Sequence, residues 1–396
     1  MIDQIHLSWT GDPATTMTFC WHSNIGGGNP RVLVTGESHG PVEVPASRHD
    51  SPGVGHLFTA NATGLRPGTG YDYRIVSDHE ESPAYSFTTI DDPVRDDLVF
   101  AFFTDTGLIG RPDGNATGTT RVYRELAKAQ PRFLLGGGDY AYANRDGRFE
   151  RVCDAVDEWF NQAQPVVARS PFFPQFGNHE AELVERFEDW QPRFALPNPI
   201  DGGRCYSFSV GGLFIVSLYA PSHRLAPEHV AWLESQLRSR ARARAEFTIV
   251  YHHEAIYSHG NSHPTSLPVR HALAPLYDEH GVDLVLNGHD QNYERTYPLG
   301  EIPHDPTPGS ESPDDYRRGD GVVFAKVSPA GKKSEIGDTF SRFVTKQHAY
   351  VAVRDDTRHH YALLTYSPGR SIVVDVYGLA DDEAELERVD RFTIRA

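Results

Sequence analysis

The sequence predicts an all-β domain of about 90 residues, residues 1–92, followed by an α/β domain, residues 93–396. Three observations lead to this prediction. A chain of 396 residues is too long for one ordinary core. The first part reads as short alternating strands separated by turns, and from Leu98 onward continuous apolar runs alternate with helical patterns.

The first domain contains six segments that mostly alternate apolar with polar residues and are divided by Gly, Pro and Asp. They are QIHLSW, TMTFCWHS, RVLVTG, HLFTA, YDYRIVSD and AYSFTT. So many short strands within a hundred residues indicate a small antiparallel sandwich, and we expect Trp21 to be its core aromatic residue. The stretch GLRPGTGYDYRI resembles a fibronectin type III domain, in which an aromatic-rich strand follows a Pro-Gly turn.

The second domain contains five apolar runs of the kind found in strands that are buried on both faces: LVFAFF, RFLLGG, LFIVSLYA, FTIVYH and VDLVLNG. TTRVYRELAKA, with Thr residues as expected caps, and APEHVAWLESQLRSR are predicted helices. Residues near 300–320 form a predicted surface insertion. We expect the later segments YVAV, YALLTYS and SIVVDVYG to close a second sheet.

The composition excludes some classes of partner. A net charge of −17 argues against nucleic acid and against an anionic membrane, because both require a basic surface. An anionic substrate would therefore need local compensation, for which bound cations are suited. Three cysteines match no disulfide framework and no thiolate metal site. The opening residues lack the features of a signal peptide and no apolar run is long enough to span a bilayer, so we expect a soluble protein or the mature form of an exported one.

Polar residues with metal- or phosphate-binding capacity follow four of these buried runs and a fifth, FFPQF, at residues 172–176. Because ligands bind beyond the carboxyl ends of strands in open α/β sheets, we expect these residues to converge on one site. They are Asp105; Asp139 with Tyr142; Asn178 and His179; His252 and His253; and His289. This set of oxygen and nitrogen donors suits hard or borderline cations better than a structural zinc site. One bridging carboxylate can hold two cations about 3.5–4 Å apart, and such a pair stabilises in-line displacement at phosphorus.

Five ordered motifs then resemble those of the metallophosphoesterase superfamily, in particular the purple acid phosphatases. They are D-x-G at Asp105, G-D-x-x-Y from Gly138, G-N-H-E from Gly177, V-x-x-H from Val250 and G-H-x-x-x-Y-E-R from Gly288. The resemblance covers the whole chain, since those enzymes also place a fibronectin-like domain first. It implies a layered α/β/β/α catalytic domain, two metal ions (iron, zinc or manganese) and a small phosphorylated substrate. It also implies hydrolysis of phosphate monoesters by metal-bound hydroxide, and suggests a secreted or periplasmic protein, although the sequence itself leaves compartment and oligomeric state open.

The resemblance assigns the residues as follows. The first metal takes Asp105, Asp139, Tyr142 and the residue at Gln291, and the second takes Asp139, Asn178, His253 and His289. Asn178 and His179 contact the phosphate, and His263, in preference to His259, is the substrate-side or proton-donating histidine, so His179 and His263 are the predicted catalytic residues.

Gln291 departs from the pattern, because the family has G-H-x-H where this chain has Gly-His-Asp-Gln. A neutral amide should weaken the first site, particularly for ferric iron, and favours manganese, magnesium or calcium, whereas a phenolate at Tyr142 favours a trivalent ion.

Alternatives remain open at this point. Asp105 taken alone could be a helix cap, Tyr140 competes with Tyr142, and Asn178 could be a turn former. The same site could serve phosphodiesters or nucleotides. The chain could also be a non-catalytic binding protein with a vestigial metal site.

Overall fold

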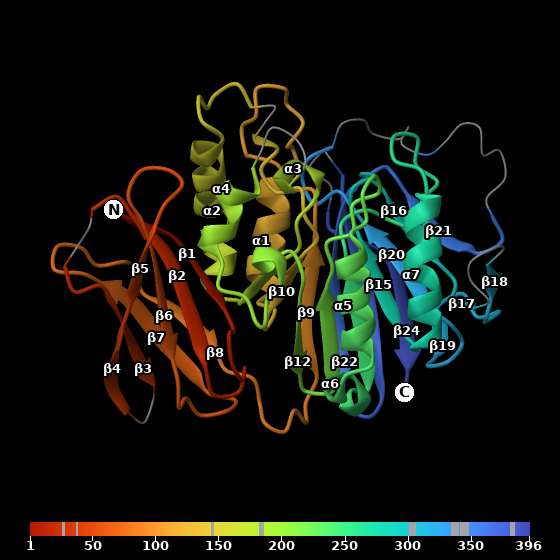
Figure 1. Cartoon of the computed structure of the whole chain (residues 1–396), viewed down its shortest axis with the longest axis horizontal. Helices are drawn as coiled ribbons and strands as arrows, with labels where there is room; N and C mark the ends of the chain where they lie inside the picture. Colours follow the sequence, from red (N-terminus) through yellow and green to blue (C-terminus); the bar gives the residue numbers. More distant parts are fainter. Residues whose placement is uncertain are drawn as a thin grey trace.

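In the computed structural model the chain forms two domains that lie side by side, with the N-terminal domain on the left of Figure 1. The structure describes residues 1–25, 28–36, 39–143, 146–181, 186–300, 306–333, 340, 348–380 and 385–396. β8 ends at Thr88 and β9 begins at Leu98, so the predicted boundary at residues 92 and 93 falls in the segment that connects the domains. Among the described helices, none is long and apolar enough to cross a membrane.

The first domain is the predicted sandwich, with two four-stranded antiparallel sheets in the orders β1-β2-β6-β5 and β4-β3-β7-β8. The strands are β1 (Ile2–Ser8), β2 (Met17–Ser23), β3 (Arg31–Gly36), β4 (His39–Pro45), β5 (Ser47–Asp50), β6 (His56–Ala62), β7 (Gly70–Val76) and β8 (Tyr85–Thr88). Trp21 is buried as expected and stacks on Phe58 with 5.4 Å between ring centroids. The sequence did not indicate β4, which contains Gly and Pro, or β5, whose residues are all exposed.

The second domain has two stacked seven-stranded sheets. The first, called the β9 sheet, has the order β11 (Phe172–Pro174), β10 (Leu134–Gly136), β9 (Leu98–Phe103), β22 (His359–Ser367), β23 (Ser371–Leu379), β24 (Glu387–Arg395) and β19 (Asp315–Arg317). The second, called the β14 sheet, has the order β12 (Tyr206–Val210), β13 (Leu213–Ser217), β14 (Phe247–Tyr251), β15 (Leu284–Asn287), β20 (Val323–Val327), β16 (Tyr293–Thr296) and β21 (Val351–Asp355). Apart from these sheets, β17 (Leu299–Gly300) pairs antiparallel with β18 (Thr307–Pro308).

Both faces of each sheet are covered, which confirms the α/β/β/α layers. Phe100 and Phe102 of β9 face the core between the sheets, whereas Phe103 faces α1 (Thr119–Ala129) and α2 (Val152–Val167). In the same way, Ile249 of β14 points inward and Val250 points toward α5 (Pro227–Leu237) and α7 (Leu267–Glu279). This alternation explains why the strands read as continuous apolar runs. The remaining helices are short: α3 (Asn178–Ala181), α4 (Phe187–Trp190), α6 (Arg240–Arg244), η2 (Gln191–Arg193) and η3 (Asp201–Gly203).

Three details differ from the sequence-based expectations. β21 joins the β14 sheet, but β22 and β23 join the β9 sheet, because β22 pairs directly with β9; the late strands therefore do not form one separate sheet. The predicted insertion near 300–320 lies partly outside the described residues, at 301–305, and its residues 315–317 form the edge strand β19. Gly118 caps α1, and the hydroxyl of Thr119 donates to the Thr106 carbonyl instead of capping the helix.

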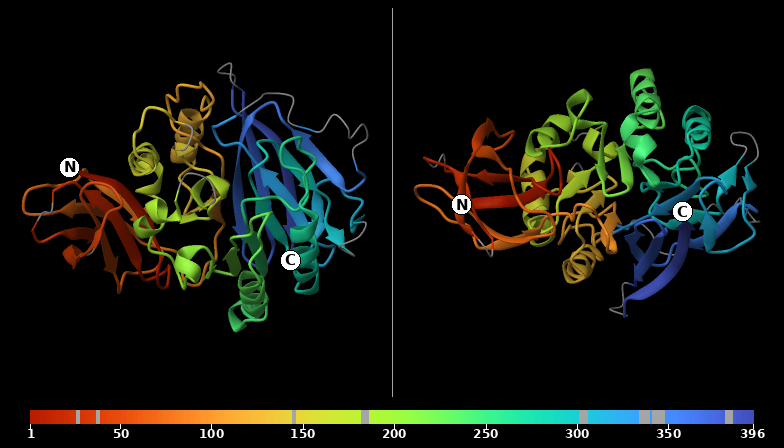
Figure 2. Two further views of the ribbon diagram at one scale, coloured as in Figure 1. Left: turned by 45° about the horizontal axis from the view of Figure 1, so that its top comes forward. Right: turned by 90° about the horizontal axis from the view of Figure 1, so that it is seen from below.

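The strand directions locate the functional site. β9, β10 and β11 are parallel to one another, and so are β13, β14, β15 and β20. The carboxyl ends of neighbouring parallel strands lie at the same edge of a sheet, so each sheet presents its strand-end loops together. Figure 2, left, turns the top of the view in Figure 1 toward the viewer, and with it the loops at the upper ends of these strands.

Candidate metal centre

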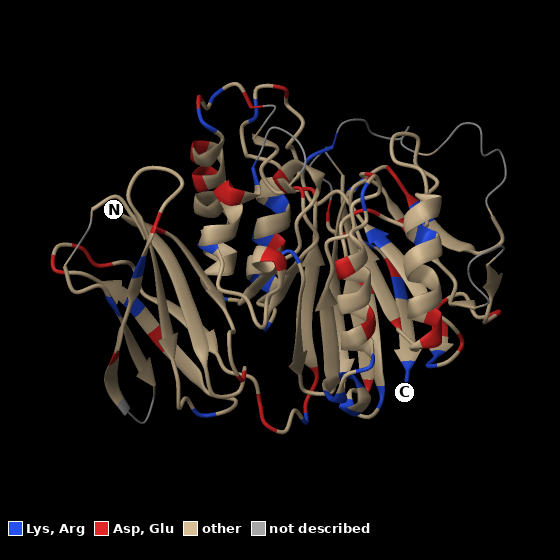
Figure 3. Cartoon of the chain, in the orientation of Figure 1, with Lys and Arg blue, Asp and Glu red and all other residues tan. Residues whose placement is uncertain are grey.

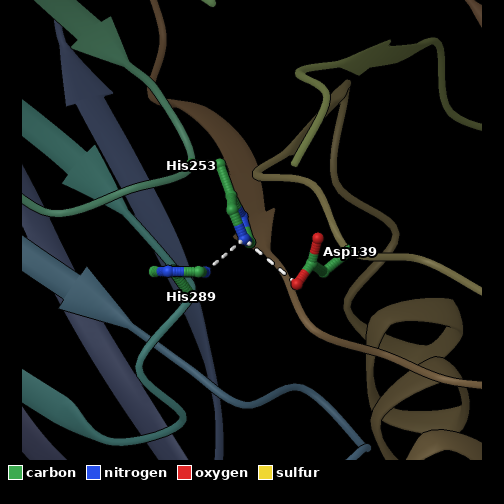
Figure 4. Close-up of side chains that lie close together, drawn as sticks. All are labelled: Asp139, His253 and His289. Atoms are coloured by element: carbon green, nitrogen blue, oxygen red, sulfur yellow. Dashed lines mark hydrogen bonds and ion pairs between the residues drawn. The ribbon is translucent and has the colours of Figure 1, made fainter. Parts of the chain in front are cut away.

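The predicted ligand residues lie at the edge where the two sheets meet. Asp139 follows β10 of the β9 sheet, and His253 and His289 follow β14 and β15 of the β14 sheet. Their donor atoms all lie within 4.8 Å of one another, and Figure 4 shows the three side chains pointing toward a common centre. His253 Nε2 is 3.2 Å from Asp139 Oδ2 and 3.2 Å from His289 Nδ1. Asp139 thus meets two histidines that lie more than a hundred positions later in the chain, and the three residues form one group.

The backbone around this group orients the ligand atoms. His253 Nδ1 lies 2.7 Å from the Gly137 carbonyl, which can only accept, so Nδ1 donates and Nε2 is free to face the group. The His179 backbone N–H donates to Asp139 Oδ1 at 3.0 Å and fixes the carboxylate plane. A Cβ at Gly177 would lie 2.2 Å from Asp139 Oδ1, so only glycine allows this approach.

Asn178 supplies the clearest sign that a cation fits. Its Oδ1 atom is buried and has no hydrogen-bond partner in the described part of the chain. Asn178 and His253 line the same small hollow, together with Gly177 and Tyr219. A buried carbonyl oxygen without a partner costs about 1–3 kcal/mol, and coordination of a cation would satisfy it. The residues of the predicted second site therefore fit a metal ion.

The residues of the predicted first site also meet. The Tyr142 hydroxyl donates to Asp105 Oδ1 at 2.7 Å, and Gln291 Nε2 lies 3.4 Å from the Tyr142 hydroxyl. Asp105 Oδ2 accepts bonds from the Thr104 and Ser328 hydroxyls, each at 2.8 Å, and from the His289 backbone N–H at 3.0 Å. Asp105 is thus well satisfied by the protein itself, unlike the oxygen of Asn178.

Tyr140, the rival of Tyr142, has a structural place. Its hydroxyl donates to the Gln175 carbonyl at 2.6 Å, and its ring packs against Trp159 and Trp190 in the helical core. Tyr142 is the tyrosine that faces Asp105.

Opposed charges shift the pKa values in this group. Burial raises the pKa of Asp139, but the neighbouring His253 and His179 outweigh burial and hold it well below its usual range. Burial lowers the pKa of His253, yet the carboxylate of Asp139 raises it to about 10. Burial, with His253 and His263 nearby, holds the pKa of His289 well below the ordinary value. Asp139 and His289 are therefore already in the deprotonated forms that bind cations.

The other predicted histidines occupy different positions. The rings of His179 and Tyr142 have centroids 4.1 Å apart, and those of His263 and His289 are 3.7 Å apart, so His179 and His263 lie at the centre, with His263 exposed. His259 is not brought into this group: its ring pairs with Glu294 and lies 3.3 Å from the Tyr350 hydroxyl. His252 turns away and bonds to the Glu254 carbonyl at 2.8 Å.

Sequence reasoning missed the role of Glu180. This buried carboxylate accepts three backbone N–H bonds, from Asp139 at 2.7 Å, Tyr140 at 2.8 Å and Gly177 at 2.9 Å. It thereby braces the turns on both sides of Asp139. The motif G-N-H-E contains Glu180, but nothing in the sequence indicates that two of its partners are the backbone groups of Asp139 and Tyr140, 41 and 40 residues earlier.

Two further supports were also hidden in the sequence. The Lys332 ammonium lies 4.6 Å from the centroid of the Tyr142 ring, and no motif marked it. Glu294 and Arg295, adjacent in the motif G-H-x-x-x-Y-E-R, point to opposite faces of β16 and have different partners. Glu294 pairs with Lys326 and His259, and Arg295 pairs with Asp390.

Two stacked sheets that gather carboxylate, amide and imidazole donors at one edge define the class of metallophosphoesterases. Comparison with known families agrees with this. The model described as calcineurin-like phosphoesterase matches residues 98–293, and the model described as purple acid phosphatase, N-terminal domain, matches residues 2–89. The chain therefore belongs to the purple acid phosphatase-like group of the calcineurin-like phosphoesterases.

Individual relatives are distant. An uncharacterised protein of Mycobacterium tuberculosis is 28% identical over 336 residues, which cover 74% of this chain and 62% of that protein, so this chain spans less than two thirds of it. Acid phosphatase type 7 of Mus musculus is 27% identical over 383 residues, covering 89% of this chain and 82% of that protein. The structure of a purple acid phosphatase from yellow lupin seeds superposes on 100% of this chain and 74% of its own, with a TM-score of 0.82 at 18% identity, and so has the same fold.

Proposed function

We propose that this protein is a metal-dependent phosphatase that hydrolyses monoesters of small phosphorylated compounds. The observation that supports this most is the convergence of Asp139, His253 and His289 beside the unpaired oxygen of Asn178. Such a donor set, at the edge of two sheets, suits a cation that binds phosphate. The phosphatase names of the relatives support the same proposal.

The two predicted metal positions should differ in their affinity for a cation. Asp139, Asn178, His253 and His289 would hold the tighter ion. Asp105, Asp139, Tyr142 and Gln291 would hold the weaker one, because Gln291 contributes only a neutral amide and Asp105 already has four hydrogen-bond donors. When bound, such cations supply an activated water near neutral pH and stabilise the charge that develops on phosphoryl oxygens.

The chain's own residues would orient the ester and handle its protons. His179, held against the Tyr142 ring, can donate a hydrogen bond to a phosphoryl oxygen. His263 is exposed, and its ring is tilted against that of His289 with 3.7 Å between centroids, so it can protonate the departing ester oxygen. Lys332, beside Tyr142, adds positive charge near the site of a protein whose net charge is −17. Elsewhere basic and acidic residues are interspersed over both domains, as Figure 3 shows.

The test compares two neighbouring histidines after loading the protein with manganese, zinc or iron. His253→Gln should remove tightly bound metal and abolish hydrolysis of p-nitrophenyl phosphate, whereas His252→Gln, whose ring faces away, should keep both. Faster turnover of p-nitrophenyl phosphate than of bis(p-nitrophenyl) phosphate would support a monoesterase, and the reverse order a diesterase. A wild-type protein that binds none of these metals and hydrolyses neither ester would overturn the proposal.

A further inference from the structure

A buried lysine contacts the turn that carries His289 of the candidate metal centre. Lys326, on β20, has only 2% of its surface exposed. Its ammonium donates to Ser258 Oγ at 2.8 Å, Asp290 Oδ2 at 3.0 Å and Glu294 Oε2 at 3.2 Å. An ammonium so deeply buried is stable only with such partners, since burial of an unpaired charge is costly. Its three acceptors lie in the loop of Ser258, in the turn of Asp290 and on β16, so the lysine links these segments.

The first segment is the loop from Ser258 to Thr265, which carries His263. The base of this loop is closed by the bond from the Ser258 N–H to Thr265 Oγ1, at 2.9 Å. Ser258 Oγ also donates to Asp290 Oδ2 at 2.6 Å and accepts from the Gly260 N–H at 3.2 Å. The loop lies directly on Asp290, because a Cβ at Gly260 would be 1.4 Å from Asp290 Oδ2.

The second segment is the turn that carries His289 and Gln291. Both residues have left-handed backbone conformations, with φ of 77° and 43°, which are unfavourable for residues other than glycine. Asp290 lies between them, and its side chain binds Lys326 and Ser258. Because Asp290 is held by these contacts, the turn directs His289 toward the other ligand residues. The centroids of the His263 and His289 rings are 3.7 Å apart.

We propose that Lys326 is a positioning residue that docks the Ser258–Thr265 loop onto the 289–291 turn and thereby places the His263 imidazole at the departing ester oxygen. This inference rests on the proposed function for its chemical consequence. Lys326 does not touch the ester; it acts through Asp290 and Ser258 on His263. Loss of Lys326 would remove the buried positive charge that faces the Asp290 and Glu294 carboxylates, and would leave Glu294 with its contacts to His259 alone.

The chain provides a matched control on the same pair of strands. Arg295 occupies the neighbouring ladder position, opposite Ala325, whereas Glu294 is opposite Lys326. Arg295 is equally buried and pairs with Asp390 at 2.6 Å, on the other face of the sheet. Arg295→Met therefore also breaks a buried ion pair of β16, but without a partner in the His263 loop.

The experiment measures kcat for p-nitrophenyl phosphate and phenyl phosphate, since phenolate leaves less readily and depends more on protonation. Lys326→Met should lower kcat for phenyl phosphate about tenfold more than for p-nitrophenyl phosphate, within the range of general-acid effects. Arg295→Met should lower both equally. In a His263→Ala background, Lys326→Met should have little further effect on kcat, because the group it positions is gone. If Lys326→Met fails to fold, Ser258→Ala should give the same leaving-group dependence in weaker form.

The inference would be overturned if Lys326→Met lowered kcat equally for both esters. It would also be overturned if the effects of Lys326→Met and His263→Ala on kcat were fully additive. Backbone amide exchange separates this failure from failure of the proposed function. In metal-free protein, Lys326→Met should speed exchange in the Ser258–Thr265 loop and Arg295→Met should not, even if the wild-type protein hydrolyses neither ester. Unchanged exchange of that loop in Lys326→Met would refute the docking role by itself.

Discussion

We predict that the hydrogen bonds of Glu180 hold Asp139 in the position from which it can bind a cation. In Glu180→Gln the amide oxygen can still accept from the Asp139 and Gly177 N–H groups, as Oε2 does now, but the amide NH₂ then faces the Tyr140 N–H. One hydrogen bond is lost and one buried donor is left unpaired, which together should lower the free energy of unfolding by about 2–4 kcal/mol. Because the brace orients a ligand, metal affinity should also fall about 10- to 100-fold.

The assays are urea unfolding of the metal-free protein and calorimetric titration with zinc or manganese. Asp283→Asn is the control, since the Asp283 carboxylate likewise accepts a buried backbone N–H, that of Thr248 at 2.7 Å. Asp283 precedes β15, at the opposite end from His289, so its substitution should lower stability and leave affinity unchanged. Wild-type affinity in Glu180→Gln, or an equal loss of affinity in Asp283→Asn, would refute the bracing role.

Three other outcomes are expected. Gln291→His should tighten the weaker metal position, raising the stoichiometry measured by metal analysis at limiting metal; an unchanged stoichiometry and affinity would remove Gln291 from the site. Gly177→Ala should displace Asp139 and abolish tight metal binding, whereas Gly147→Ala, with open space around its Cβ, should bind metal normally. Glu294, whose pKa is held at about 2 despite burial, chiefly by the charge of Lys326, should stabilise the fold above pH 4.5 and lose this contribution as the pH falls toward 2. Unfolding curves should show that wild type loses about 2 kcal/mol more than Glu294→Gln between pH 5 and pH 3, and parallel losses would contradict the assigned pairing.

Local pattern predicted much of the fold because both domains follow simple periodicities. The helix at Thr119–Ala129 has the predicted limits, and the strand at Leu98–Phe103 coincides with the run LVFAFF. The sequence did not allow us to predict which sheet each of the late strands would join. The run YALLTYS reads like any other buried strand, and its pairing with β9, more than 250 residues earlier, depends on how the two sheets close.

The candidate site was predictable where a residue type follows a strand end. Asp139, His253 and His289 could be named for this reason, and the structure brings them together. His259 illustrates the limit, because it lies four residues from His263 in the same loop, yet its ring turns to Glu294. The direction of a loop side chain is set by partners on other segments, which spacing along the chain does not encode.

The hydrogen bonds around the site also explain how its backbone is held. Five of the ten non-glycine residues with positive φ in the described part of the chain are predicted ligands: Asp105, Asp139, Tyr142, His289 and Gln291. Each such conformation costs on the order of 1–3 kcal/mol and persists only if the surroundings enforce it. Glu180 enforces it at Asp139, and the Asp105 carboxylate enforces it at His289 by accepting the His289 N–H. Because these contacts are made by the protein alone, the ligand geometry is set before a cation arrives. Under the proposed function, binding energy from a cation would then not be needed to fold the site and would remain available to hold phosphate.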